Sequence, residues 1–367
     1  MRMNRLSFVG ISSVVVASMC GWACSSSSNG EASNAAENDA GENTGSDAGG
    51  AMTDAGPPTK LNDAGTSTTD GGSAVAAPWG SIGASAYVAC ALGTGGIFCW
   101  SENYEDGGAG DPHLLEGTAS VAHFVTTDGA SEFLADGGSY DIADVCTVDT
   151  SGVLSCPFGA PDLSGVTVSK LTANLDGHQC AIDTSGIVKC WGDNSMGALG
   201  DGTANPNHKI VSVSLPKKAI DISAPEAGTC ALLDGGEVYC WGQVAFVAND
   251  TPSKLDLGGA KAVALSSNVG SGGSMCAMLN DGSVKCFGNS FDTSRMNGAK
   301  SLSIDFFGVV CGVMSDASVK CLGASDPTLP EKIIDLSPGY ETFVARGASG
   351  AVYRWSQGQS ATKVTLP

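Results

Sequence analysis

The stretch HQCAIDTSGIVKCWGDNSMGALGDGT, residues His178–Thr203, contains a frame that recurs along most of the chain. The frame is a cysteine, nine further residues, a second cysteine and then Trp-Gly. Five cysteine pairs are ten residues apart and one is nine apart: Cys90/Cys99, Cys146/Cys156, Cys180/Cys190, Cys230/Cys240, Cys276/Cys286 and Cys311/Cys321. Residues 344–355 (VARGASGAVYRW) align without gaps on residues 180–191, with Val344 and Arg354 in place of the cysteines. The chain therefore contains seven copies of one repeat, and the repeat must decide the fold.

Each copy has the pattern of a β-hairpin. In the third copy, Ala181-Ile182 and Ile187-Val188 flank the turn residues Thr184-Ser185-Gly186. A three-residue loop that ends in a left-handed residue favours glycine at its last position. With this loop, Cys180 falls directly opposite Cys190. Directly opposed residues of antiparallel strands lie about 4.5–5.5 Å apart at Cα, which is close enough for a disulfide.

The same register applies to the other copies. The loops 150–152, 234–236, 280–282 and 348–350 all end in glycine, and a two-residue turn at Thr94-Gly95 sets Cys90 opposite Cys99. The loop Ser315–Ala317 lacks glycine, so we expect that turn to be strained or different. The sequence thus predicts six cross-strand disulfides, each contributing roughly 2–3 kcal/mol. The alternatives are buried free thiols and zinc sites, but zinc ligands cluster at spacings of about two to four residues.

The beginning of the chain has the features of an export signal. Two arginines precede the apolar run Leu6–Met19, which is too short to span a membrane as a mature helix. This segment resembles a bacterial lipoprotein signal, in which a small residue, here Ala23, precedes a cysteine that is lipidated after cleavage, here Cys24. Cys20 would be lost with the signal and Cys24 would carry the lipid. Every cysteine outside the repeats is then accounted for. The alternative is a plain secretory signal cleaved elsewhere, and both lead to an oxidising compartment.

Residues 25–77 differ in composition from the rest. They are rich in Gly, Ser, Thr, Asn, Ala and Asp, and eight acidic residues face one lysine, Lys60. Such a segment cannot bury enough apolar surface to order itself. We therefore predict a signal peptide at 1–23, an acidic tether at 24–77 with a reach of about 40 Å, and a folded domain at 78–367. Calcium binding by the recurring Asp-Ala-Gly is an alternative, although its spacing forms no fixed loop.

The length of the folded part suits a closed ring. About 290 residues over seven copies give roughly 41 per copy, the size of a four-stranded propeller blade. Residues 363–367 (KVTLP) resemble residues 211–216 (VSVSLP), which directly precede the next copy. We therefore expect a last blade completed by strands from both ends, whereas an open solenoid would need polar caps. The stretches after Cys156, Cys286 and Cys321 are short, so blades two, five and six should lack the arm that carries Gly-x-Leu-Gly-x-Gly.

The motif residues also resemble a known repeat. The third copy carries His178, Cys180, Gly186, Cys190-Trp191-Gly192, Asn194, Gly197 and Leu199-Gly200-Asp201-Gly202. This pattern resembles the regulator-of-chromosome-condensation repeat, in the cysteine-bearing version of exported bacterial proteins. The resemblance extends over 78–367 and is degenerate outside the third copy. It implies an all-β fold, a seven-bladed β-propeller, here with one intra-blade disulfide in six blades.

The sequence offers no clear catalytic constellation. Gly197–Gly202 (GALGDG) superficially matches a dinucleotide-binding pattern, but it lies between hairpins and reads as a turn. His178 occupies a repeat position, where a structural hydrogen bond is the expected role. Asp193–Ser195 are expected to form a turn. Trp191 and Trp241 are expected to pack between blades. We expect no catalytic residue, no metal and no cofactor.

The charge balance bears on partners. Residues 78–367 contain 30 acidic and 15 basic residues. A surface this negative repels phosphate backbones, so nucleic acid is an unfavourable partner.

The function that these features favour is a non-catalytic binding scaffold. The resemblance implies that a propeller face grips a protein or a cell-surface ligand. Aromatic side chains anchor such interfaces. The candidates are Tyr104, Phe124, Phe246, Phe291, Phe306 and Phe307, although each could instead belong to a blade core. The expected protein is a monomer, attached through lipid on Cys24 to the outer membrane or cell surface.

Two alternatives belong to other functional classes. One is a hydrolase or lyase that acts on cell-envelope material from a site in the central channel, which would require converging carboxylates or a metal. The other is a structural envelope protein without a discrete site. No spacing in the sequence predicts the first, whereas the decay of the motif in several copies is compatible with the second.

Overall fold

The computed structural model describes residues 79–84, 88–93, 95–101, 112–115, 118–126, 145–156, 163, 165–174, 177–205, 209–268, 273–288, 290–339 and 341–367. All of them lie in the unit Asn62–Pro367. The predicted signal peptide, the tether, the lipidation candidate Cys24 and the aromatic candidate Tyr104 lie outside the described residues.

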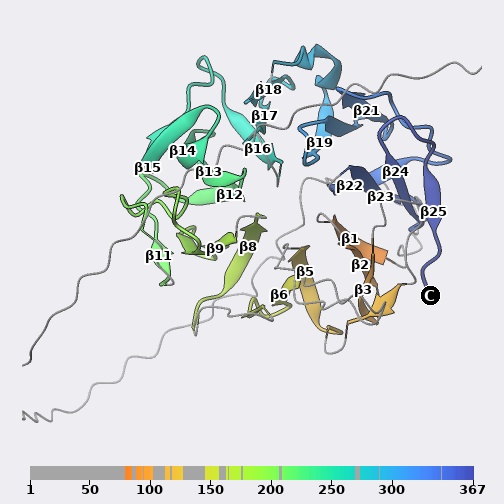
Figure 1. Ribbon diagram of the computed structural model, residues 1–367, viewed down its shortest axis with the longest axis horizontal. Coiled ribbons are helices and arrows are strands. Elements are labelled where there is room, and N and C mark those ends of the chain that lie inside the picture. The colour runs from red at the N-terminus through yellow and green to blue at the C-terminus, as the bar shows by residue number, and fades with distance from the viewer. Residues whose placement is uncertain are drawn as a thin grey trace, which may run out of the picture. The chain divides into compact units, whose positions relative to one another are not determined.

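The described strands form seven antiparallel sheets arranged around a common axis, with the first strand of each sheet nearest the axis (Figure 1). Four sheets have four strands: β1 (Trp79–Ala84), β2 (Val88–Gly93), β3 (Gly96–Ser101), β4 (His113–Leu114); β8 (Val168–Ala173), β9 (His178–Asp183), β10 (Val188–Gly192), β11 (Val211–Ser212); β12 (Ala219–Ser223), β13 (Ala227–Leu233), β14 (Val238–Val244), β15 (Val247–Lys254); and β22 (Ile333–Pro338), β23 (Thr342–Gly347), β24 (Val352–Ser356), β25 (Thr362–Val364). Three sheets have three strands: β5 (Val121–Thr126), β6 (Val145–Asp149), β7 (Leu154–Ser155); β16 (Ala262–Ser267), β17 (Met275–Leu279), β18 (Val284–Phe287); and β19 (Ala299–Ile304), β20 (Val310–Met314), β21 (Val319–Leu322). The protein is therefore a seven-bladed β-propeller, as the repeat predicted.

The predicted hairpin register is confirmed. Cys180 pairs with Cys190 across β9 and β10, and Asp183 N–H donates to the Ile187 carbonyl at 3.0 Å around the turn. Gly186 has φ +84°, the left-handed conformation that the loop requires. All six predicted disulfides are present, with Cα atoms 4.0 to 4.3 Å apart. These separations are slightly below the expected range, and they match the closer type of antiparallel pair.

The loop without glycine is strained, as expected. Ala317 has φ +64°, one of two positive φ values among the described residues other than glycine. The turn closes as in the other blades, because Ala317 N–H donates to the Met314 carbonyl at 2.9 Å. A side chain in the left-handed region of backbone conformation costs about 1–2 kcal/mol. The hairpin register therefore imposes on Ala317 a conformation that alanine disfavours.

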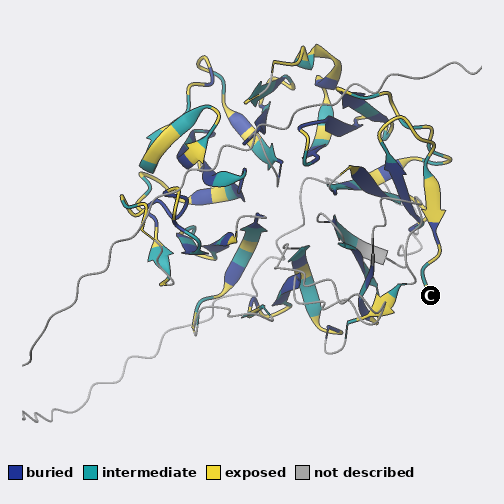
Figure 2. Ribbon diagram, viewed as in Figure 1, coloured by how far each residue is buried: buried dark blue, intermediate teal, exposed yellow. Residues whose placement is uncertain are grey.

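The apolar core lies between neighbouring blades. One cluster joins Ile182 and Leu199 of blade three to Ile222, Leu233 and Trp241 of blade four. Figure 2 shows the same distribution, with buried residues along the strands and exposed residues at loops and outer strands. Every first strand also carries one register irregularity against the second strand. A bulge at this point increases the local twist of each blade.

The expected mode of ring closure is wrong. Among the described strands, the last blade consists of β22, β23, β24 and β25, and β1 pairs with β2. The reason is that the segment resembling residues 211–216 forms an outermost strand, β25, just as residues 211–212 form β11. The ring instead closes by packing between complete blades. Ala84 N–H donates to Ser337 Oγ at 3.0 Å, and Trp100 packs in a cluster with Val344 and Val364.

The three shortened blades are those that the sequence predicted. In blade six, side chains take the place of the missing fourth strand. Cys321 N–H donates to Asp326 Oδ1 at 2.9 Å, and Arg295 Nη1 donates to the Cys321 carbonyl at 3.1 Å. Arg295 lies in the one-turn 3-10 helix η1 (Thr293–Met296) and forms an ion pair with Asp326 at 2.8 Å. In the described part of the chain, no helix is long and apolar enough to cross a membrane.

Candidate functional site

The strand order gives the propeller two distinct faces. Since neighbouring strands are antiparallel, the connections after the first and third strands of each blade lie at one end, which we call the loop face. The hairpin turns and the connections to the next blade lie at the opposite end, which we call the turn face. Phe246, Phe291, Phe306 and Phe307 all fall in loop-face segments.

The structure separates the predicted aromatic residues by burial. Phe124 is buried in the core cluster that contains Cys90 and Ile97. Phe246 is half-buried, and its ring centroid lies 5.4 Å from that of Phe287 in the next blade. These two positions agree with the blade-core interpretation, whereas the remaining three aromatic residues reach the surface.

Phe291 of blade five and the Phe306–Phe307 pair of blade six are together called the aromatic patch. A Cβ added at Gly323 would meet both Phe291 and Val309, which follows the pair by two residues. Phe307 is 52% exposed and Phe291 is 37% exposed, which is unusual for side chains of this size. The rings of Phe306 and Phe307 meet edge to face with centroids 5.2 Å apart. The ring of Phe291 lies over Gly323, where an added Cβ would be 3.1 Å from its Cζ.

A tight loop presents the Phe306–Phe307 pair. Asp305 N–H donates to the Val309 carbonyl at 3.0 Å, and Gly308, with φ +84°, donates its N–H to the Asp305 carbonyl. The Asp305 carboxylate accepts the N–H groups of Phe307 at 3.0 Å and Val309 at 2.8 Å. Burial raises the pKa of this carboxyl, and the hydrogen bonds to its ionised form oppose that shift. The loop is therefore closed on itself by backbone and side-chain bonds.

Neighbouring blades fix the same loop from both sides. On the blade-seven side, Phe306 N–H donates to the Gly339 carbonyl at 3.4 Å, and Gln357 Nε2 donates to Asp305 Oδ2 at 2.9 Å. On the blade-five side, Asn268 Nδ2 donates to the Phe306 carbonyl at 3.5 Å. The aromatic pair is thus pre-organised, and little conformational entropy remains to be lost when it binds. The residues Asp305, Asn268 and Gln357 were not predicted, since no sequence spacing connects them.

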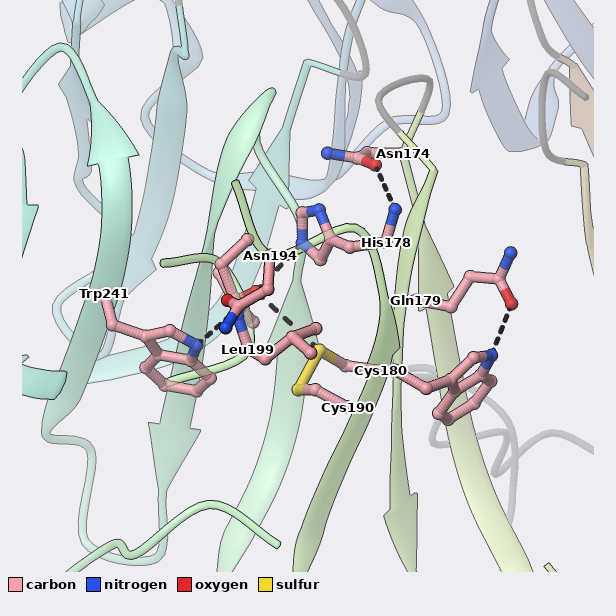
Figure 3. Close-up of a disulfide and its surroundings, with 11 residues drawn as sticks. Asn174, His178, Gln179, Cys180, Cys190, Asn194, Leu199 and Trp241 are labelled. Atoms are coloured by element: carbon pink, nitrogen blue, oxygen red, sulfur yellow. Dashed lines mark hydrogen bonds between the residues drawn. A yellow bond between two sulfur atoms is a disulfide. The ribbon is translucent and has the colours of Figure 1, made fainter. Parts of the chain in front are cut away.

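The repeat motif itself serves the joint between blades three and four (Figure 3). Figure 3 shows the Cys180–Cys190 disulfide beside His178, Leu199 and Trp241. Trp241 Nε1 donates to the Ala198 carbonyl at 2.8 Å, and Leu199 is completely buried. The glycine-rich stretch is therefore a turn packed on the next blade, as predicted, and not a phosphate-binding loop.

His178 has the predicted structural role. It is buried, and its Nε2 lies 3.0 Å from Thr229 Oγ1 of blade four. Burial lowers the pKa of His178 to about 4, so the ring is neutral at physiological pH. Asn194 closes the adjacent turn, because its Oδ1 accepts the Leu199 N–H at 3.0 Å. His178 therefore joins two blades, and Asn194 holds the turn that packs on blade four.

The carboxylates of the described inner strands are engaged with cations. Asp221 on β12 pairs with Lys170 on β8 at 2.8 Å, and Asp335 on β22 lies 3.8 Å from Arg346. Within the residues that the structure describes, no group of three or more His, Cys, Asp or Glu side chains is placed to hold a metal ion. The described inner strands hold carboxylates neutralised by neighbours rather than a converging acid pair.

One pocket was not anticipated from the sequence. A cavity of about 530 Å³ on the turn face of blade four is lined by Lys217, Glu237, Lys254, Asp256 and Lys261, among others. The Glu237 carboxylate contacts Lys217 at 2.6 Å and Lys254 at 2.5 Å. These two lysines lower the pKa of Glu237 to about 2. Lys217 and Lys254 are thus paired with a carboxylate inside the pocket, which weakens their attraction for an external anion.

The comparisons with known proteins agree with the repeat. No protein-family model matches the chain. The human regulator of chromosome condensation is 34% identical over 85 residues, which cover 22% of this chain and 20% of that protein. The RCC1 domain-containing protein RUG3, mitochondrial, of Arabidopsis thaliana is 29% identical over 89 residues, which cover 23% of this chain and 20% of that protein. The chain thus spans a fifth of the length of these curated relatives.

A solved structure shows the same architecture. The CRINKLY WD40 ectodomain of the Arabidopsis thaliana receptor kinase ACR4 superposes with a TM-score of 0.55 at 19% identity. The match covers 79% of this chain and 99% of that ectodomain. This likeness establishes the fold alone, and the function must be argued from the surface of the propeller.

Proposed function

We propose that this chain, whose repeats are of the regulator-of-chromosome-condensation type, is a non-catalytic protein-binding scaffold held in the cell envelope by lipid on Cys24. One observation carries the proposal. Phe307 is exposed at the loop face beside the half-buried Phe306, yet seven hydrogen bonds from their own blade and its neighbours hold their loop in place.

The aromatic patch has the properties of a binding anchor. Aromatic residues are enriched among the side chains that dominate interface energetics, and rigid anchors lose little entropy on association. Phe307 exposes half of its surface although a buried position would be more favourable for an apolar ring. The inner-strand carboxylates Asp221 and Asp335 are engaged with cations, which favours binding over channel-sited hydrolysis.

The proposed location follows from the cysteines and the start of the sequence. Six disulfides indicate an oxidising, extracytoplasmic compartment. The lipoprotein-like signal then supplies Cys24 as the attachment point, and the acidic segment 25–77 supplies the tether. One lipidated cysteine would hold the propeller near a membrane and leave both faces accessible.

Photo-crosslinking in cells that express the full chain tests the binding role. A photoreactive phenylalanine analogue replaces Phe307, and the matched control places it at Val263, which is 55% exposed near the turn face. We expect a discrete crosslinked polypeptide from position 307 and none from position 263. Equal crosslinking at both positions, or none at 307, would contradict a loop-face binding site.

The intact mass of the mature protein tests the attachment. We expect a chain that begins at Cys24, carries lipid and lacks the twelve thiol hydrogens of the six bridges. A mature chain with cleavage elsewhere and unmodified Cys24 would show a secreted protein without an anchor. The Cys24→Ser variant provides the matched control, because it should lose the lipid and keep all bridges.

A further inference from the structure

The charge of the propeller is distributed unevenly along the chain. Residues 78–169 contain 12 acidic residues and neither lysine nor arginine. Residues 170–367 contain 18 acidic and 15 basic residues. A field of one sign attracts partners of the opposite sign and accelerates their encounter. The sequence alone therefore favours a cationic partner without saying where it binds.

Among the described residues, the cations are also distributed unevenly between the two faces. Lys217, Lys218, Lys261 and Lys332 fall in turn-face connections, and all four are exposed. In the loop-face segments that the structure describes, Lys209 is basic, and the connection that carries Phe291 and Asp292 also holds Arg295, which is paired with Asp326 at 2.8 Å. The acidic residues of those segments are Asp193, Asp201, Glu226, Asp292, Asp305 and Glu341. Lysines are thus concentrated at the opposite end from the aromatic patch, where carboxylates such as Asp234, Asp281 and Asp316 also lie. The loop face therefore differs from the turn face in having few cations.

Two of these carboxylates are linked to the aromatic patch, one by the chain and one by a backbone hydrogen bond of its neighbour. Asp292 directly follows Phe291 and is exposed. Glu341 is exposed two residues beyond Gly339, whose carbonyl accepts the Phe306 N–H. Exposed rings flanked by carboxylates suit the side chains of lysine and arginine, since a cation can contact both a ring face and an acid.

We infer that the loop face binds a lysine- or arginine-rich surface of a partner protein, with cationic side chains seated on the aromatic patch between Asp292 and Glu341. This inference rests on the proposed binding function and adds the chemistry of the partner. The rigid Phe306–Phe307 loop fixes the position of the rings, and the carboxylates select cationic partners over neutral ones.

Fluorescence anisotropy with a labelled peptide tests the inference on the full chain. The probe is a dodecapeptide of alternating arginine and glycine, and its glutamate counterpart is the reference. We expect the arginine peptide to bind, with affinity that falls as salt increases, and the glutamate peptide not to bind. Phe307→Ser should weaken binding about tenfold, as loss of one anchor does. D292N/E341Q should weaken it as well.

The Val263→Ser variant is the matched control, because it removes an exposed apolar side chain near the other face. Equal affinity in F307S, D292N/E341Q and V263S would mean that the negative chain attracts the peptide without a site, and would overturn the inference. Absence of peptide binding together with a crosslinked partner at Phe307 would reject a basic partner but keep the scaffold. Absence of both would reject the two proposals together.

Discussion

Val344 on β23 and Arg354 on β24 lie directly opposite each other, in the positions that bridged cysteines occupy in the other six blades. Both are buried. The blade without a disulfide is also the blade that closes the ring, because Val344 packs against Trp100 and Ala89 of blade one. The hairpin at the closing interface is therefore held by packing. The hairpins of the other six blades are cross-linked by disulfides.

A seventh disulfide should form at this site. In the variant Val344→Cys/Arg354→Cys the thiols replace a directly opposed pair, so the geometry suits a bridge. The bridge would close a loop as short as those in the other blades and stabilise the fold by roughly 2–3 kcal/mol on the chain-entropy model. Mass spectrometry measures bridge formation, and urea unfolding with and without reductant measures its stabilisation. A variant that retains two free thiols after refolding in air would contradict the register.

The sequence was sufficient for the hairpins because their turns are local. A glycine at a fixed offset, such as Gly186, determines the loop type, and the loop determines which cysteines oppose each other. Ring closure was mispredicted because an outermost and an innermost strand have similar short apolar patterns. Only the pairing of β25 with β24 distinguishes the two possibilities.

The candidate site was predictable in part. The exposure of Phe291 and Phe307 could be guessed from their loop positions, but the burial of Phe124 depends on the packing of blade two against blade one. The bonds that fix the Phe306–Phe307 loop come from Asn268 and Gln357, each in a different blade. No local pattern connects residues this far apart in sequence, so only the fold could show them.

His178 should make the stability depend on pH. Its pKa is about 4 in the folded protein because of burial, against about 6.5 in an unfolded chain. Between these values the unfolded state binds a proton that the folded state excludes. The free energy of unfolding should therefore fall by about 3 kcal/mol as the pH decreases from 6.5 to 4.

Urea unfolding at several pH values measures this effect, with His178→Gln as the control. The variant loses the contact with Thr229 and should be less stable at pH 7. Its stability should nevertheless decrease less than that of the native protein between pH 6.5 and 4. Parallel pH profiles for the two proteins would show that His178 does not contribute.

Gly200 should tolerate substitution less well than Gly202. Both have positive φ, +74° and +82°, so alanine strains the backbone at either position. A Cβ at Gly200 would lie 2.7 Å from Trp241 Nε1, whereas at Gly202 the nearest atom would be 3.3 Å away, in Thr251. We expect Gly200→Ala to cost about 1–3 kcal/mol more than Gly202→Ala, which thermal unfolding would measure. Equal costs would mean that the joint between blades three and four yields to the extra methyl group.

The Arg295–Asp326 pair should protect the outer edge of blade six. In blade four the corresponding strand residue, Cys240, pairs with Ser253 of a fourth strand, but in blade six the Cys321 N–H is bound by a carboxylate. Loss of a hydrogen bond to a charged group costs about 1.5–3 kcal/mol, so Asp326→Ala should accelerate amide exchange at Cys321 at least about tenfold.

Hydrogen exchange read by NMR at Cys321 and Cys240 tests this role residue by residue. Asp326→Asn should retain most of the protection, because its amide oxygen can still accept the N–H. Arg295→Ala should have a smaller effect than Asp326→Ala, since the guanidinium contacts the Cys321 carbonyl and leaves the N–H bonded. Cys240 should exchange at the same rate in all variants. If Cys321 exchanged equally slowly with and without the carboxylate, blade six would owe its protected edge to packing of η1 rather than to the side-chain pair.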